Sequence, residues 1–137
     1  MVALNNHEQR DPGDCVTVYI EINDDIVDSK GGVINATNYV TGIFNQSFVI
    51  YANENITMTV SEILAWDIPS PYGSSGLSGF TEYTDTVNGD LGHLVAHASY
   101  GVASSIGGFC SPNPDLSKCF SGLSSFYEPF PTYSWAV

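Results

Sequence analysis

The sequence predicts an α/β fold, built on a twisted, mixed but mostly parallel sheet with helices packed on it. Three observations lead to this prediction: an alternating β-branched run at residues 16–22, a long stretch of helical period at residues 33–52, and a second alternating run at residues 56–66. The middle stretch is long enough for the helical crossover that parallel strands require. Strands that alternate with helices along a chain are typical of α/β domains.

The first half of the chain contains most of this pattern. Val16–Ile22 alternates as a half-buried strand does, Asp24–Gly32 reads as a polar turn, and Ile56–Trp66 reads as a second strand. A helix is predicted over Val33–Ala52, because its apolar residues recur in steps of three and four. These residues are Val33, Ala36, Val40, Phe44, Phe48 and Tyr51.

The second half is more irregular. Two prolines break the chain at residues 68–73, a short helix is predicted over Leu77–Val87, and Leu91–Ala96 reads as a buried strand. Gly101–Phe109 reads as a small-residue strand or bulge, and the chain from Cys110 onward as loop. We expect the three longer strands to be neighbours in one sheet, with the long helix packed across it.

Length and charge limit the function. A chain of 137 residues with 43% hydrophobic residues is most simply one domain with one core, here residues 15–137, preceded by an arm at residues 1–14. The arm has no apolar h-region and does not read as a signal peptide. Fifteen acidic residues against three basic ones give a net charge of −12, which excludes nucleic acid as a partner. The sequence also lacks the apolar run of a membrane span.

The cysteines and histidines permit two interpretations each. Cys110 and Cys119 flank a Pro-Asn-Pro-Asp turn and predict a local disulfide in an oxidising compartment, whereas all three thiolates, Cys15 included, would be needed for a zinc site. His93 and His97 could share a metal on a helix, where they would lie about 6 Å apart. On a strand they would lie about 13 Å apart and could not. The strand prediction favours structural histidines, with incidental metal binding as the alternative.

Several segments resemble, in the same order, the bacterial reprolysin-like (adamalysin-type) zinc metallopeptidases of the metzincin group. The final run, Phe130–Val137, resembles the entry into the zinc-binding helix of these enzymes. The other matching segments are Cys15–Glu21, Ala36–Val40, Tyr51–Ile56, Ser61–Trp66, Pro69–Tyr72, Gly89–Leu94 and Gly101–Cys110.

The resemblance implies a secreted enzyme that cleaves peptide bonds in protein or peptide substrates. In that family a His-Glu-x-x-His motif and a later histidine bind zinc, and the glutamate acts as general base. This sequence contains no such motif. The resemblance therefore implies the N-terminal part of a metallopeptidase domain, truncated before the zinc-binding helix and inactive as this chain. The zinc cofactor belongs to the complete domain.

The resemblance also assigns roles to residues that are present. The glycine-rich edge strand of the family pairs with the substrate backbone, which places substrate binding at Gly101, Val102, Ala103 and Ser104. The family's structural calcium would fall to Glu21 and Asp90, although two carboxylates alone bind calcium weakly.

Without the zinc-binding helix, an apolar face would be bared. Aromatic residues of the C-terminal segment would then cover this face, or copies of the chain would self-associate through it. These residues are Phe126, Phe130, Tyr133 and Trp135. A different class of function stays open beside the peptidase: a non-catalytic extracellular binding module that uses the exposed sheet edge.

Overall fold

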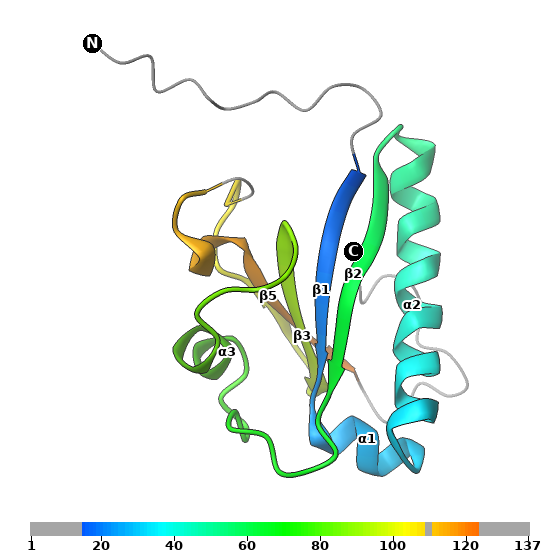
Figure 1. Ribbon diagram of the computed structural model, residues 1–137, viewed down its shortest axis with the longest axis vertical. Coiled ribbons are helices and arrows are strands. Elements are labelled where there is room, and N and C mark those ends of the chain that lie inside the picture. Colours follow the sequence, from blue (N-terminus) through cyan, green and yellow to red (C-terminus); the bar gives the residue numbers. More distant parts are fainter. Residues whose placement is uncertain (1–14, 109–110, 124–137) are drawn as a thin grey trace.

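A computed structural model describes residues 15–108 and 111–123, and it shows a five-stranded sheet with helices on both faces (Figure 1). Helix α2 covers one face and α3 lies on the other, while α1 packs at the end of the sheet. The elements are β1 (Cys15–Ile22), α1 (Asp24–Lys30), α2 (Val33–Asn53), β2 (Thr57–Ala65), α3 (Leu77–Tyr83), β3 (Leu91–His97), β4 (Gly101–Ala103), a 3₁₀ helix (Pro114–Ser117) and β5 (Lys118–Leu123).

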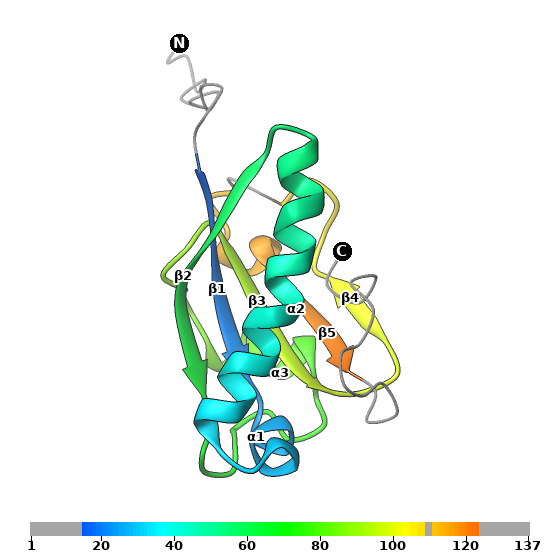
Figure 2. The same ribbon diagram turned by 90° about the vertical axis from the view of Figure 1, so that its right-hand side faces the viewer.

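The strand order is β2-β1-β3-β5-β4. The pairs β1–β2, β1–β3 and β3–β5 are parallel, and β4 runs antiparallel to β5. This confirms the predicted α/β class and the mostly parallel sheet, and it confirms that β2, β1 and β3 are neighbours. In the view of Figure 2, α2 crosses the face of the sheet while β5 and β4 lie beside the helix.

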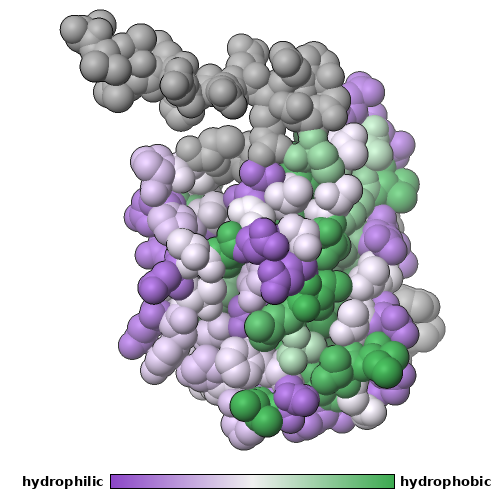
Figure 3. Space-filling model, in the orientation of Figure 1, coloured by the Kyte–Doolittle hydropathy of each residue, from purple (hydrophilic) through white to green (hydrophobic). Residues whose placement is uncertain are grey.

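Alternation along the strands divides the buried side chains into two cores. Val18, Ile20 and Ile22 of β1 face α2 and join the larger core. Tyr19, between them, faces the other way and packs with Phe80 of α3. The surface reflects the acidic composition: in Figure 3 the side around α3 is mainly hydrophilic, and hydrophobic residues gather toward α1 and α2.

Helix α2 is the longest element, and its prediction is confirmed to within one residue at its end. Its buried face contains Ala36, Val40, Ile43 and Phe44, spaced as one side of a helix requires, and also Ser47. Within the described residues, no helix has both the length and the apolar run that a membrane span needs.

The polar turn expected at residues 24–32 is a helix instead. Asp24 and Asp25 occupy its first turn and Lys30 its last, where each charge opposes the helix dipole. Ile26 and Val27 are buried, and Gly31 ends the helix in the left-handed region at φ 77°. The charged composition of this segment suggested a turn. The two aspartates at its start and the glycine at its end nevertheless mark the limits of a short helix.

The loop expected after Cys110 was also wrong in part. Residues Lys118–Leu123 form β5, which lies between β3 and β4. Of the expected strand at residues 101–109, the structure describes residues 101–108, and only Gly101–Ala103 of these are strand. The alternation of β5 is disguised because Lys118, although charged, is 1% exposed, and because a glycine stands at position 122. A Cβ on Gly122 would lie 2.5 Å from the carbonyl oxygen of Tyr100, so the close approach of the chain requires glycine.

Candidate functional site

Strand β4 forms one edge of the sheet and contains three of the residues predicted to bind substrate. The Gly122 amide donates to the Tyr100 carbonyl over 2.8 Å, and the Ser104 amide donates to the Lys118 carbonyl over 3.0 Å. Because ladder bonds alternate along an antiparallel strand, the backbone groups of Gly101 and Ala103 point away from β5. Gly101–Ala103 is exposed and Ser104 half-buried, so the predicted four residues lie together at an open edge.

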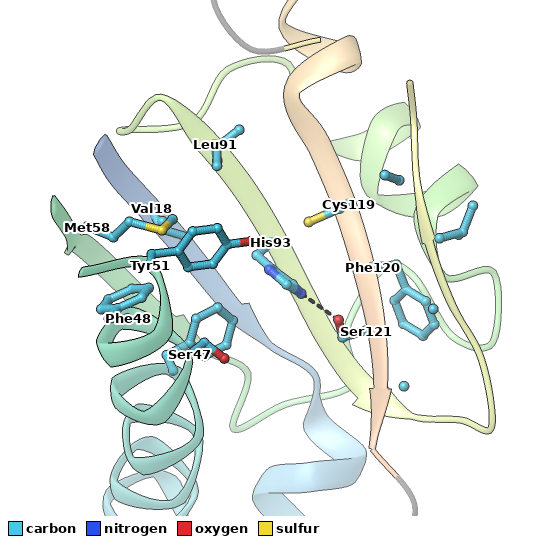
Figure 4. Close-up of a pocket in the computed structure, with 15 residues that line it drawn as sticks. Val18, Ser47, Phe48, Tyr51, Met58, Leu91, His93, Cys119, Phe120 and Ser121 are labelled. Atoms are coloured by element: carbon cyan, nitrogen blue, oxygen red, sulfur yellow. Dashed lines mark hydrogen bonds between the residues drawn. The ribbon is translucent and has the colours of Figure 1, made fainter. Parts of the chain in front are cut away.

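A groove of about 440 Å³ adjoins this edge on the α2 face of the sheet (Figure 4). Its walls are the second half of α2, with Phe48 and Tyr51, and the β4–β5 pair, where Ala103 lies directly opposite Cys119 on the groove face. Aromatic and aliphatic side chains predominate, and none of the 15 lining residues carries a full charge at neutral pH. The protein has a net charge of −12, but this groove has no charged side chain that could pair with a buried charge. The groove therefore disfavours a charged ligand.

Three polar side chains from three elements lie among these apolar walls. His93 of β3 and Ser121 of β5 are hydrogen-bonded, with 2.7 Å between Nε2 and Oγ (Figure 4). Ser47 of α2 is 1% exposed, and its hydroxyl oxygen has no partner among the described residues. The groove therefore combines an apolar lining with a few polar groups, the usual composition of a binding site.

The titratable groups of the groove favour binding over nucleophilic chemistry. Burial lowers the pKa of His93 to about 4, so the imidazole is neutral at pH 7 and only weakly basic. Its ring also packs edge-on against Phe44, with 4.8 Å between ring centroids. Burial raises the pKa of the Cys119 thiol to about 12, which keeps the thiol protonated. The His93–Ser121 pair is thus a neutral hydrogen bond.

The lowered pKa of His93 makes stability depend on pH. The folded pKa of about 4 lies below the ordinary value of 6.5, so the unfolded chain binds a proton first as the pH falls. Stability from neutral His93 is complete above pH 6.5 and is lost toward pH 4, with about 2 kcal/mol lost by pH 5. We expect urea unfolding to show this slope, and His93→Gln to flatten it between pH 5 and 7. An unchanged slope would show that His93 does not titrate as a buried group.

A metal ion shared by His93 and His97, the alternative to structural histidines, does not fit the geometry. His93 and His97 lie on strand β3, as predicted, and are therefore about 13 Å apart. The Nδ1 of His97 lies 3.1 Å from the Leu123 carbonyl oxygen and its Nε2 lies 2.9 Å from the Ser29 hydroxyl. Within residues 15–108 and 111–123, no three histidine, cysteine, aspartate or glutamate side chains are grouped as a metal site requires. These residues do not fit zinc.

Glu21 and Asp90, the predicted calcium ligands, are not brought together. Asp90 accepts hydrogen bonds from the Thr17 amide and hydroxyl, both 2.8 Å long. Thr17 and Glu21 are four residues apart on β1, which separates the two carboxylates by about 13 Å along the strand. Glu21 is 2% exposed and accepts hydrogen bonds from two tyrosines and a tryptophan. Both carboxylates hold the fold together, and their arrangement does not fit a shared calcium ion.

Some predicted residues lie outside the described part of the chain. Cys110 is one, so its disulfide with Cys119 stays a prediction; the same holds for the aromatic residues after position 123. Sequence reasoning missed Ser47 and Ser121. Ser47 falls three residues after Phe44 on the apolar face of the predicted helix, and a serine at such a position is the signal that could have identified it.

No protein-family model matches the chain, and no curated protein matches its sequence. The function is therefore argued from the edge strand and the groove.

Proposed function

We propose that this chain is the substrate-binding part of a secreted, zinc-dependent metalloendopeptidase domain, in which an extended peptide adds to the sheet beside β4. One observation supports this most: the backbone groups of Gly101 and Ala103 point outward on an exposed antiparallel edge strand. Main-chain pairing at such an edge provides affinity, and a neighbouring groove provides side-chain selectivity. The sequence resemblance assigns substrate binding to the same residues.

The residues of this chain would bind and orient the peptide. Outward amides and carbonyls of β4 fix its direction, and the uncharged groove accepts apolar side chains. Hydrolysis in the complete domain would use a zinc-activated water and a general base. Because the sequence has no His-Glu-x-x-His and its described residues do not fit zinc, we expect this chain to bind peptides without cleaving them.

The second candidate is a non-catalytic extracellular module that recognises peptides through the same edge. The exposed edge is complete, and the two described histidines, His93 and His97, are engaged in structural hydrogen bonds, which favours this candidate. A chain extended through the residues that follow Val137 in its gene separates the two candidates. Zinc-dependent cleavage by the extended chain supports the peptidase, and binding without cleavage supports the module.

The edge can be tested by removing one outward amide. Ala103→Pro deletes an N–H that does not bond to β5, and we expect peptide affinity to fall about five- to tenfold, the value of one hydrogen bond. Fluorescence anisotropy with a library of labelled, neutral heptapeptides measures this. Val102→Thr, which keeps every backbone donor, is the matched control and should bind normally.

Two results would contradict the proposal. Equal affinity of Ala103→Pro and the unaltered chain, with circular dichroism showing both folded, would exclude pairing at β4. Metal-dependent turnover by the 137-residue chain that His93→Ala abolishes would overturn the expected inactivity.

A further inference from the structure

The groove contains a buried polar group, the Ser47 hydroxyl, that lacks a partner in the described part of the chain. The Ser47 hydroxyl is inaccessible to water, has no hydrogen-bond partner among the described residues, and belongs to the α2 wall (Figure 4). Buried hydroxyls in native proteins are almost always hydrogen-bonded. Opposite Ser47 lies the uncharged, hydrogen-bonded pair of His93 and Ser121. The groove is thus built for an occupant that is mostly apolar and carries a polar tip.

Tyrosine and tryptophan side chains have this character. Each has a large apolar ring and one polar atom that finds a hydrogen-bond partner when buried. Charged side chains do not suit the groove, since none of its lining residues could neutralise them.

The chain itself contains such a segment next to the groove. Residues 124–137 follow Leu123 directly, at the end of the strand whose residues 119–122 line the groove. They lie outside the described part, and only their sequence enters here: five aromatic residues and one charged residue, Glu128. Fourteen residues reach about 46 Å when extended, more than the return along β5 requires. The aromatic residues are Phe126, Tyr127, Phe130, Tyr133 and Trp135.

We propose that the groove between α2 and the β4–β5 pair is the docking site of the chain's own segment 124–137. The aromatic rings fill the groove, and a tyrosine hydroxyl or the Trp135 N–H reaches the Ser47 hydroxyl. The net charge of −12 disfavours a second copy as the occupant, because two copies repel each other. The proposed function uses the same groove, so the docked segment would compete there with the side chains of a bound peptide; the test below uses no peptide and does not depend on that function.

The test uses the emission of Trp135 in the full chain. Its contribution is the difference between the unaltered chain and Trp135→Phe, because the only other tryptophan is Trp66. We expect blue-shifted emission and protection from acrylamide, a neutral quencher suited to an acidic protein. Ala103→Glu places a charge in the groove wall at an exposed site opposite Cys119, and it should shift the emission to the red and increase quenching.

Ile34→Glu is the matched control, because Ile34 is 76% exposed at the start of α2 and outside the groove. Its emission should equal that of the unaltered chain, and Ala103→Lys should repeat the effect of Ala103→Glu. Solvent-exposed emission in the unaltered chain, or protected emission that neither Ala103 variant changes, would overturn the proposal. Sedimentation should show a monomer. A dimer whose dissociation exposes Trp135 would overturn the proposal and would show that the segment occupies the groove of a second copy.

Discussion

Replacing Glu21 by alanine is expected to destabilise the domain by about 3–5 kcal/mol, because it leaves several buried donors without an acceptor. One carboxylate oxygen of Glu21 accepts from the Trp66 Nε1, 2.6 Å away, and from the Tyr72 hydroxyl. The other oxygen accepts from the Tyr19 hydroxyl over 3.0 Å. These partners come from β1 itself and from the β2–α3 connection, so a single carboxylate fixes that connection on the sheet.

The same cluster keeps its tyrosines protonated. Burial first, and then the Glu21 carboxylate, raise the pKa of Tyr19 and of Tyr72 above the ordinary value. Both hydroxyls therefore remain donors over the whole physiological pH range. Because donors surround the carboxylate, Glu21→Gln, which retains one acceptor oxygen, should cost far less than Glu21→Ala.

Urea unfolding of three variants checks this prediction. Glu62→Ala is the control, since Glu62 is an exposed acid on β2 whose loss should change stability by less than about 0.5 kcal/mol. If Glu21 instead served as a calcium ligand, chelation with EGTA would lower the melting temperature of the unaltered chain and calcium would restore it. We expect no change, and such a reversible fall would contradict the role assigned here to Glu21.

The sequence was sufficient to locate an element where one regular spacing of apolar residues ran through the whole of it. The β-branched alternation of β1 and the apolar stripe of α2 identified both elements almost to the residue. Prediction failed where polar residues occupy buried positions. In strand β5, Lys118 and Gly122 are buried and Ser121 is half-buried. Lys118 and Ser121 hydrogen-bond to side chains that only the folded structure brings to them, so the local sequence pattern does not reveal the strand.

The candidate site divides in the same way. The edge strand could be located because residues 101–104 are contiguous and resemble a known motif. The groove could not, because Ser47, His93 and Ser121 come from three elements and line one groove only when α2 packs across the sheet. His93 on a strand could be predicted, but not the serine that would bond to it.

Replacing Lys118 by alanine should destabilise the domain by about 3–5 kcal/mol and loosen the candidate site with it. The Lys118 side chain is 0% exposed, and its ammonium donates to the Thr84 carbonyl, to the Asp85 carbonyl over 3.4 Å and to Asp115 over 2.8 Å. Its nitrogen lies 5.6 Å from the centroid of the Phe80 ring, and the attraction between the cation and the ring face also stabilises the buried ammonium. Alanine removes the buried stem and leaves two carbonyls with one donor fewer.

Lys118→Met separates the loss of the buried apolar stem from the loss of the ammonium donor, because methionine keeps most of the stem and lacks the ammonium. We expect it to cost about 1–3 kcal/mol, the price of the unpaired acceptors. Asp115→Asn is the control: Asp115 is 47% exposed, so solvent screens its ion pair and the change should stay below about 1 kcal/mol. Because β5 pairs with β4, amide exchange at Val102 should quicken in Lys118→Ala and not in Asp115→Asn. A Lys118→Met variant as stable as the unaltered chain would show that the ammonium contributes nothing, and normal exchange at Val102 in Lys118→Ala would show that the edge strand does not depend on it.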